Sequence, residues 1–154
     1  MKYVADLHLH SRYSRAVSRD MTLPIMADFA IKKGINILTT GDFTHPLWFR
    51  EISTQLVEAG DGVYKLNSKL KSQNLELDKL KFILTVEISS IYSQGGKTRR
   101  IHSLVFAPNL EVADKIKENL YKDLVGVEVK KDKIESTILE SLKNSILEVL
   151  VEPP

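Results

Sequence analysis

Short apolar runs alternate with amphipathic stretches over most of this chain, which predicts strands alternating with helices. Strands are predicted over residues 3–7, 35–40, 81–88 and 100–106, and a Gly-Gly turn within residues 93–97 joins the last two strands as a hairpin. Helices are predicted from Thr22, a capping residue followed by Pro24, to Gly34, and over residues 49–59 and 112–120. This alternation favours an α/β fold.

Two segments depart from the alternation. Residues 60–79 are polar, with glycines first and then a mixture of lysine, serine, asparagine and glutamine, so we expect a mobile insertion there. Near the end of the chain, Asp132 can cap a final helix in which apolar residues recur every four positions and form one apolar stripe.

Composition restricts the classes of protein that fit. The chain has 154 residues, of which 43% are hydrophobic and 27% charged, as expected for one globular domain. It has no cysteine, which excludes a disulfide scaffold and a thiolate zinc site. The net charge of +2 does not by itself predict a nucleic-acid or membrane partner. No apolar run reaches ~18 residues and the N-terminus does not resemble a signal peptide, so we expect a cytoplasmic protein without membrane contact.

The end of the first predicted strand carries two histidines, His8 and His10. Alternate side chains of a strand share one face, so both imidazoles point the same way. Two such imidazoles can begin a site for a divalent metal ion, and the alternative is a polar strand end with two solvated histidines.

Further candidate ligands follow the later strands. Asp42 follows the second strand, where ligands gather in α/β folds, although a turn aspartate bonding its own backbone is the simpler alternative. Glu87 ends an otherwise apolar run, and its burial needs a compensating cation or hydrogen bonds unless it faces water at a sheet edge. His102 lies within the next strand, where a lone histidine is more often part of a core. Because His8, His10, Asp42 and Glu87 lie at or near strand ends, and His102 faces them across the predicted hairpin, the sequence predicts one shared metal site.

These residues resemble a known family. Ala5-Asp6-Leu7-His8-Leu9-His10-Ser11 and Thr40-Gly41-Asp42, followed by Glu87 and His102, are similar to motifs of the PHP (polymerase and histidinol phosphatase) superfamily, and the segments around His8, Ser18-Arg19-Asp20-Met21-Thr22 and Thr40–Trp48 resemble the PHP domain of endonuclease Q. The resemblance implies a partial, distorted (β/α) barrel that acts as a metal-dependent phosphoesterase, cutting DNA on the 5′ side of deaminated bases.

The resemblance also implies a role for each matching residue. His8 and His10 would hold a first metal ion, Glu87 would bridge the first and second ions as the catalytic carboxylate, and His102 would bind the second. Asp42 occupies the place of a third-metal histidine in many members. The ions expected are Zn²⁺ or Mn²⁺.

Basic side chains near these ligands are candidates for substrate binding. Arg12 and Arg15 lie in the loop after the two histidines, and His45 lies close to Asp42. We expect them to contact substrate phosphates, although solvated loop charges are an equal alternative. DNA is the expected partner if the endonuclease Q resemblance extends to function.

The chain also departs from the family. Members complete the site with a later histidine and a final Asp-x-His, but no histidine follows His102, and Arg15 stands where many members have aspartate or histidine. We therefore divide the chain into an incomplete PHP-like metal-binding domain, residues 1–125, and a divergent helical tail, residues 126–154. Three functions stay open: an endonuclease Q-like hydrolase, a small-molecule phosphatase of the histidinol phosphatase branch, and a non-catalytic remnant that binds metal or DNA. A missing C-terminal portion, or a second copy of the chain, could supply the absent ligands.

Overall fold

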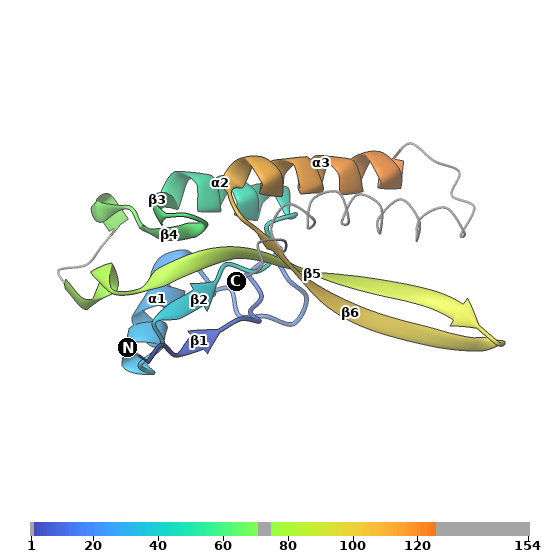
Figure 1. The fold of residues 1–154 in the computed structure, drawn as a ribbon, viewed down its shortest axis with the longest axis horizontal. Coiled ribbons are helices and arrows are strands. Elements are labelled where there is room, and N and C mark those ends of the chain that lie inside the picture. Colours follow the sequence, from blue (N-terminus) through green and yellow to red (C-terminus); the bar gives the residue numbers. More distant parts are fainter. Residues whose placement is uncertain (1, 71–74, 126–154) are drawn as a thin grey trace, which may run out of the picture.

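Strands from both halves of the described chain form one mixed sheet in the computed structural model, which describes residues 2–70 and 75–125. Three strands run parallel: β1 (Ala5–Asp6), β2 (Ile37–Thr39) and β5 (Lys81–Gln94). The helix α1 (Leu23–Lys32) connects β1 to β2, with proline in its first turn and Gly34 just after its end. The predicted strand–helix alternation is confirmed for this part of the chain (Figure 1).

The second predicted helix is displaced and is followed by strands. α2 (Pro46–Gln55) begins at its proline, three residues before the predicted start, and ends before buried Leu56. The next residues form β3 (Leu56–Gly60), which pairs antiparallel with β4 (Val63–Leu66), and β4 pairs antiparallel with β5.

The predicted insertion over residues 60–79 is therefore wrong where the structure describes it. Besides β4, this segment contains two single-turn 3-10 helices, Ser68–Leu70 and Leu75–Asp78. Tyr64, Leu66 and Leu77 are buried in the core. Only a few apolar side chains mark the segment in the sequence, and their burial depends on packing against distant elements.

The predicted hairpin is confirmed, and it is longer than expected. β5 pairs antiparallel with β6 (Lys97–Ala107) from Leu84 to Gln94, through a turn in which Gly95 and Gly96 have positive φ. Its distal part projects from the sheet as a two-stranded arm (Figure 1). The chain then continues into α3 (Leu110–Val125), where the side chain of Asn109 accepts a hydrogen bond from the backbone N–H of Val112.

The core lies between the sheet and its helices. α2 and α3 lie together above the sheet (Figure 1), and the Lys117 ammonium sits 4.2 Å from the centre of the Phe49 ring. Trp48 and Phe82 are fully or almost fully buried in the core.

The α/β class is confirmed, but the described strands form an open sheet rather than a closed barrel. The predicted final helix and the rest of residues 126–154 lie outside the described part of the chain. None of the described helices combines the length and the apolar character needed to cross a membrane.

Candidate metal centre

Three of the predicted ligands meet beside the carboxyl end of β1. The Nε2 atoms of His8 and His10 lie 3.0 and 3.1 Å from the same oxygen, Oε2 of Glu87. One possible ligand atom from each residue can be chosen so that all three lie within 4.8 Å of one another. Residues that are almost eighty positions apart in the sequence therefore lie side by side, and their binding of a metal ion stays a prediction.

The fourth residue of this group, His102, comes from the hairpin. Glu87 lies opposite Leu104 and Ser89 opposite His102, so the His102 side chain is diagonal to Glu87 on the same face of the ribbon. Nδ1 of His102 is hydrogen-bonded to Oε1 of Glu87. The His102 side chain is 57% exposed, so the interpretation of this histidine as a core residue is wrong.

Glu87 is held by imidazoles on both of its oxygens. Hydrogen bonds from His102 and then from His8 lower the pKa of the Glu87 carboxyl below its ordinary value. The side chain is only 13% exposed, which excludes the alternative of a carboxylate facing open water at a sheet edge. The carboxylate is the common partner of the three histidines.

Asp42 is placed differently from the other predicted ligands. Its Oδ2 accepts hydrogen bonds from the backbone N–H of Ser11 (2.6 Å) and from the hydroxyls of Ser11 (2.8 Å) and Ser14 (2.6 Å). Its Oδ1 lies 3.1 Å from Nδ1 of His10. Partial burial raises the pKa of Asp42, but the hydrogen bonds from Ser14, Ser11 and His10 outweigh burial and leave the pKa below its ordinary value. Asp42 thus contacts the far side of the His10 ring, away from Glu87.

A close backbone contact explains why the ends of β1 and β2 lie together. Gly41 has φ +62, and a Cβ built at this position would lie 2.2 Å from the carbonyl oxygen of Leu9. Only glycine allows this approach without a shift. The indole N–H of buried Trp48 donates to the carbonyls of Thr40 and Gly41, at 3.1 and 2.9 Å, which fixes the turn from the other side.

The predicted substrate-binding residues lie around the edge of this centre. Arg12 is ion-paired with Glu51 of α2, which also accepts a hydrogen bond from the Tyr13 hydroxyl at 2.6 Å. The hydrogen bond to Glu51 raises the pKa of Arg12. Arg15 is exposed. His45 stacks on the Tyr13 ring, with the ring centroids 4.4 Å apart. Their binding of substrate stays a prediction.

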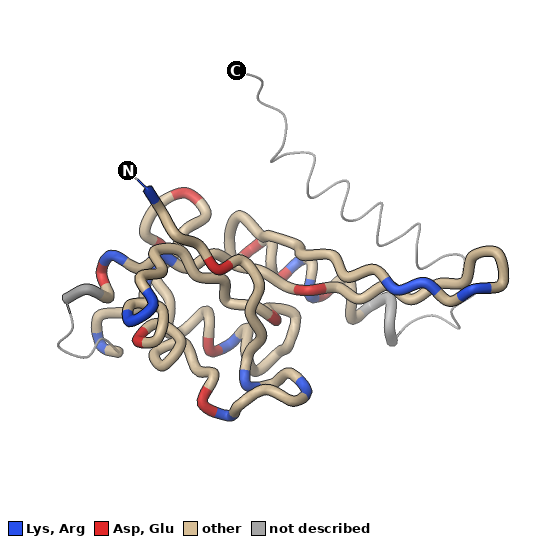
Figure 2. Tube along the Cα trace, turned by 90° about the horizontal axis from the view of Figure 1, so that it is seen from below, with Lys and Arg blue, Asp and Glu red and all other residues tan. Residues whose placement is uncertain are grey.

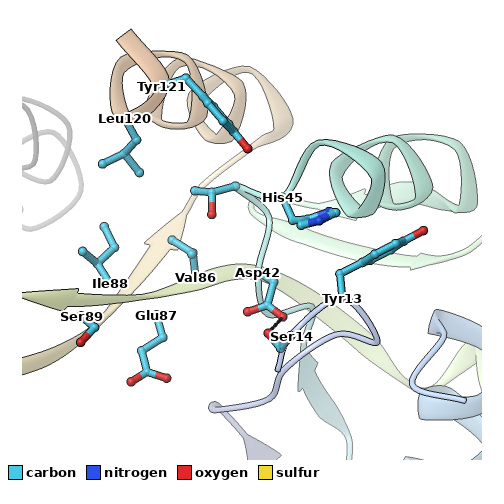
Figure 3. Close-up of a pocket in the computed structure, with 11 residues that line it drawn as sticks. Tyr13, Ser14, Asp42, His45, Val86, Glu87, Ile88, Ser89, Leu120 and Tyr121 are labelled. Atoms are coloured by element: carbon cyan, nitrogen blue, oxygen red, sulfur yellow. Dashed lines mark hydrogen bonds between the residues drawn. The ribbon is translucent and has the colours of Figure 1, made fainter. Parts of the chain in front are cut away.

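A pocket of ≈ 420 Å³ opens beside Glu87 and Asp42 (Figure 3). Its walls come from the loops after β1 and β2, from β5 and from α3. The sequence indicated none of its aromatic and aliphatic lining beyond His45, because no pattern links a loop tyrosine to a helix about a hundred residues later. The lining residues not predicted from the sequence as site residues include Tyr13, Thr44, Val86, Ile88, Leu120 and Tyr121.

Comparison with known proteins places this geometry in context. No family model matches the chain. It is 31% identical over 117 residues to the uncharacterized protein MJ0043 of Methanocaldococcus jannaschii, a match that covers 76% of this chain and 11% of that protein. This chain thus spans about a tenth of the length of that curated relative.

Two solved structures are also similar. The crystal structure of the lesion-specific endonuclease PfuEndoQ from Pyrococcus furiosus matches with a TM-score of 0.58 and 32% identity, over 76% of this chain and 25% of that one. A structure of endonuclease Q in complex with a 27-mer duplex substrate, with an abasic lesion at the active site, matches with a TM-score of 0.57 and 35% identity, over 74% of this chain and 24% of that one. The matched part of this chain therefore has an endonuclease Q-like fold, equivalent to about a quarter of those proteins.

Proposed function

We propose that this chain is the metal-binding part of a PHP-type phosphoesterase that hydrolyses phosphodiester bonds of DNA in the manner of endonuclease Q. The convergence of His8 and His10 on one oxygen of Glu87 carries the proposal. The similarity to a lesion-specific endonuclease and to an endonuclease Q–DNA complex supports DNA as the substrate.

The donor set fits a divalent ion. Two imidazole nitrogens face one carboxylate oxygen at about hydrogen-bond distance, an arrangement that needs protons or a cation between them. If Nδ1 of His10 donates to Asp42, the Nε2 lone pair is free for a metal ion. Imidazole and carboxylate together suit Zn²⁺ or Mn²⁺. Bound there, such an ion would supply Lewis acidity towards a phosphate oxygen.

Each residue has its own proposed role around this ion. His8 and His10 would hold it through Nε2, and Asp42 would orient the His10 ring as a carboxylate behind a metal-bound histidine. Glu87 presents Oε2 to this pair and Oε1 to His102, so its two oxygens can serve two adjacent ions. This arrangement supports Glu87 as the bridging, catalytic carboxylate and His102 as a ligand of the second ion.

The substrate test compares three DNA duplexes with a small phosphate monoester. The full chain is stripped of metal, reloaded with Mn²⁺ or Zn²⁺, and incubated with an undamaged duplex, a deoxyinosine duplex, a uracil duplex or p-nitrophenyl phosphate. We expect nicking on the 5′ side of the deaminated base. Release of phosphate from the monoester without nicking would favour the small-molecule phosphatase, and bound metal without any hydrolysis would favour the non-catalytic remnant.

The role of Glu87 is tested in the same assay. We expect Glu87→Gln to lower the nicking rate at least about a hundredfold, because a neutral amide cannot bridge two cations as a carboxylate does. Glu58→Gln is the matched control, since Glu58 lies exposed on β3, away from the centre, and should retain the full rate. Equal rates for the two variants would exclude the bridging role.

A further inference from the structure

The arm formed by the distal parts of β5 and β6 is basic. Between residues 88 and 107 the sequence has no aspartate or glutamate, but it has Lys97, Arg99 and Arg100 close to the tip. All three are exposed, and none forms an ion pair with a described residue. Figure 2 shows blue segments, which mark lysine and arginine, towards the far end of the arm that leaves the body of the protein. The arm therefore offers positive charge that the described protein does not neutralise.

The strand register sorts these charges between the two faces of the arm. Facing residues of an antiparallel pair project to the same side, and successive residues alternate. Because Ser89 faces His102 and Ile91 faces Arg100, Arg100 projects from the same face as the metal-centre residue His102. Arg99, which faces Tyr92, projects from the opposite face.

The spacing places Arg100 next to the metal centre. Arg100 is two residues from His102 along β6, so their Cα atoms are about 7 Å apart. Over two residues the twist of the ribbon rotates the side chains only slightly, so both stay on one face. The same face carries the hydroxyls of Ser89 and Thr98, which can donate to phosphate oxygens. Because the proposed metal centre binds one phosphate of a DNA strand, this face of the arm is suited to binding the neighbouring phosphates of the same DNA strand.

We propose that the face of the arm carrying Ser89, Thr98 and Arg100 binds the phosphodiester backbone of the DNA strand held at the metal centre, with Arg100 on a phosphate next to the reacting one. The inference rests on the proposed function for its choice of DNA. The guanidinium forms bidentate hydrogen bonds with phosphate oxygens, which a lysine at the same place would not. In this arrangement the arm positions the DNA strand, and the metal centre hydrolyses it.

The test uses two arginines of equal charge on opposite faces of one ribbon. Binding of the full chain to a short fluorescein-labelled DNA duplex is measured by fluorescence anisotropy, with divalent ions chelated and at salt concentrations from about 50 to 200 mM. We expect Arg100→Gln to weaken binding about tenfold and to reduce the slope of log K against log salt by about one. For Arg99→Gln, the change in log K should be less than half of the change for Arg100→Gln. Thermal unfolding midpoints identical to that of the parent chain show that both exposed substitutions leave the fold intact.

Each other outcome refutes the assignment. Equal losses for the two variants would mean that the arm attracts DNA only through its general charge, and no loss for either would place the DNA elsewhere. A parent chain that binds no duplex would also overturn it, and self-association that depends on Arg100 would assign the face to a second copy of the chain. Since the measurement needs no metal and no cleavage, its failure is distinguishable from failure of the proposed hydrolase.

Discussion

The contact between Gly41 and the histidine-bearing segment predicts a large effect for the smallest substitution there, Gly41→Ala. The new Cβ would lie 2.2 Å from the Leu9 carbonyl oxygen, 2.9 Å from the Leu9 carbonyl carbon and 3.3 Å from the His10 Cα. Relief of this overlap requires a shift of about 1.3 Å between the two backbones, because unstrained contacts lie near 3.5 Å. The positive φ of 62° adds a second cost for any side chain.

Gly34→Ala separates these two costs. Gly34 also has a positive φ, of 72°, but nothing lies within 4 Å of the added Cβ. We expect this control to lose about 1 kcal/mol of unfolding free energy from the left-handed backbone alone. Gly41→Ala should lose that amount and about 1–3 kcal/mol more from overpacking. Urea unfolding of the metal-free protein measures both values.

Metal affinity is a second measurement on the variants Gly41→Ala and Gly34→Ala. Because Leu9 and His10 move with the shifted backbone, we expect Gly41→Ala to weaken Zn²⁺ binding by about 10–100-fold, as the loss of precise ligand orientation does elsewhere. Competition with a chromogenic chelator gives the affinity, and Gly34→Ala should keep the parent value. Equal unfolding free energies for the two variants, or unchanged Zn²⁺ affinity in Gly41→Ala, would refute the role of this contact.

Two more predictions concern the ligands. Replacing both His8 and His10 with alanine should abolish stoichiometric Zn²⁺ or Mn²⁺ by elemental analysis, whereas His45→Gln should keep the metal; unchanged metal in the double variant would remove the proposed site. Asp42 has a pKa below its unfolded value, so its contribution to stability is present above about pH 4 and is lost as the pH falls through the folded pKa. Asp42→Asn should therefore lower the unfolding free energy of the metal-free protein at pH 7 by about 1.5–3 kcal/mol. The unfolding free energy of this variant should also fall less steeply than that of the parent as the pH is lowered, as measured by urea unfolding at a series of pH values. An acid decline as steep as that of the parent would contradict this assignment.

Local patterns predicted the elements that have strong local signals. The β-branched run before Thr40 forms β2, the prolines mark the first turns of α1 and α2, and the Gly-Gly pair forms the hairpin turn. Elements whose burial depends on distant partners were missed. β4 has two core residues, Tyr64 and Leu66, whose surroundings come from elsewhere in the chain: Tyr64 pairs with Phe82 of β5 and accepts a hydrogen bond from the Leu110 N–H, and Leu66 pairs with Leu56 of β3.

Sequence alone identified His8, His10 and Glu87 as residues that could bind a metal, because histidine and carboxylate side chains are typical ligands. The predicted strand face is wrong as its cause: β1 ends at Asp6, so His8 and His10 lie in the loop after it, with their ring centroids 5.1 Å apart. Only the tertiary structure decided what each residue contacts. The register of β5 with β6 brings His102 to Glu87, and the approach of Gly41 to Leu9 brings Asp42 behind His10 rather than into the group of three. Register and close backbone approach depend on contacts between residues far apart in the chain, so the local pattern of polar and apolar positions does not encode them.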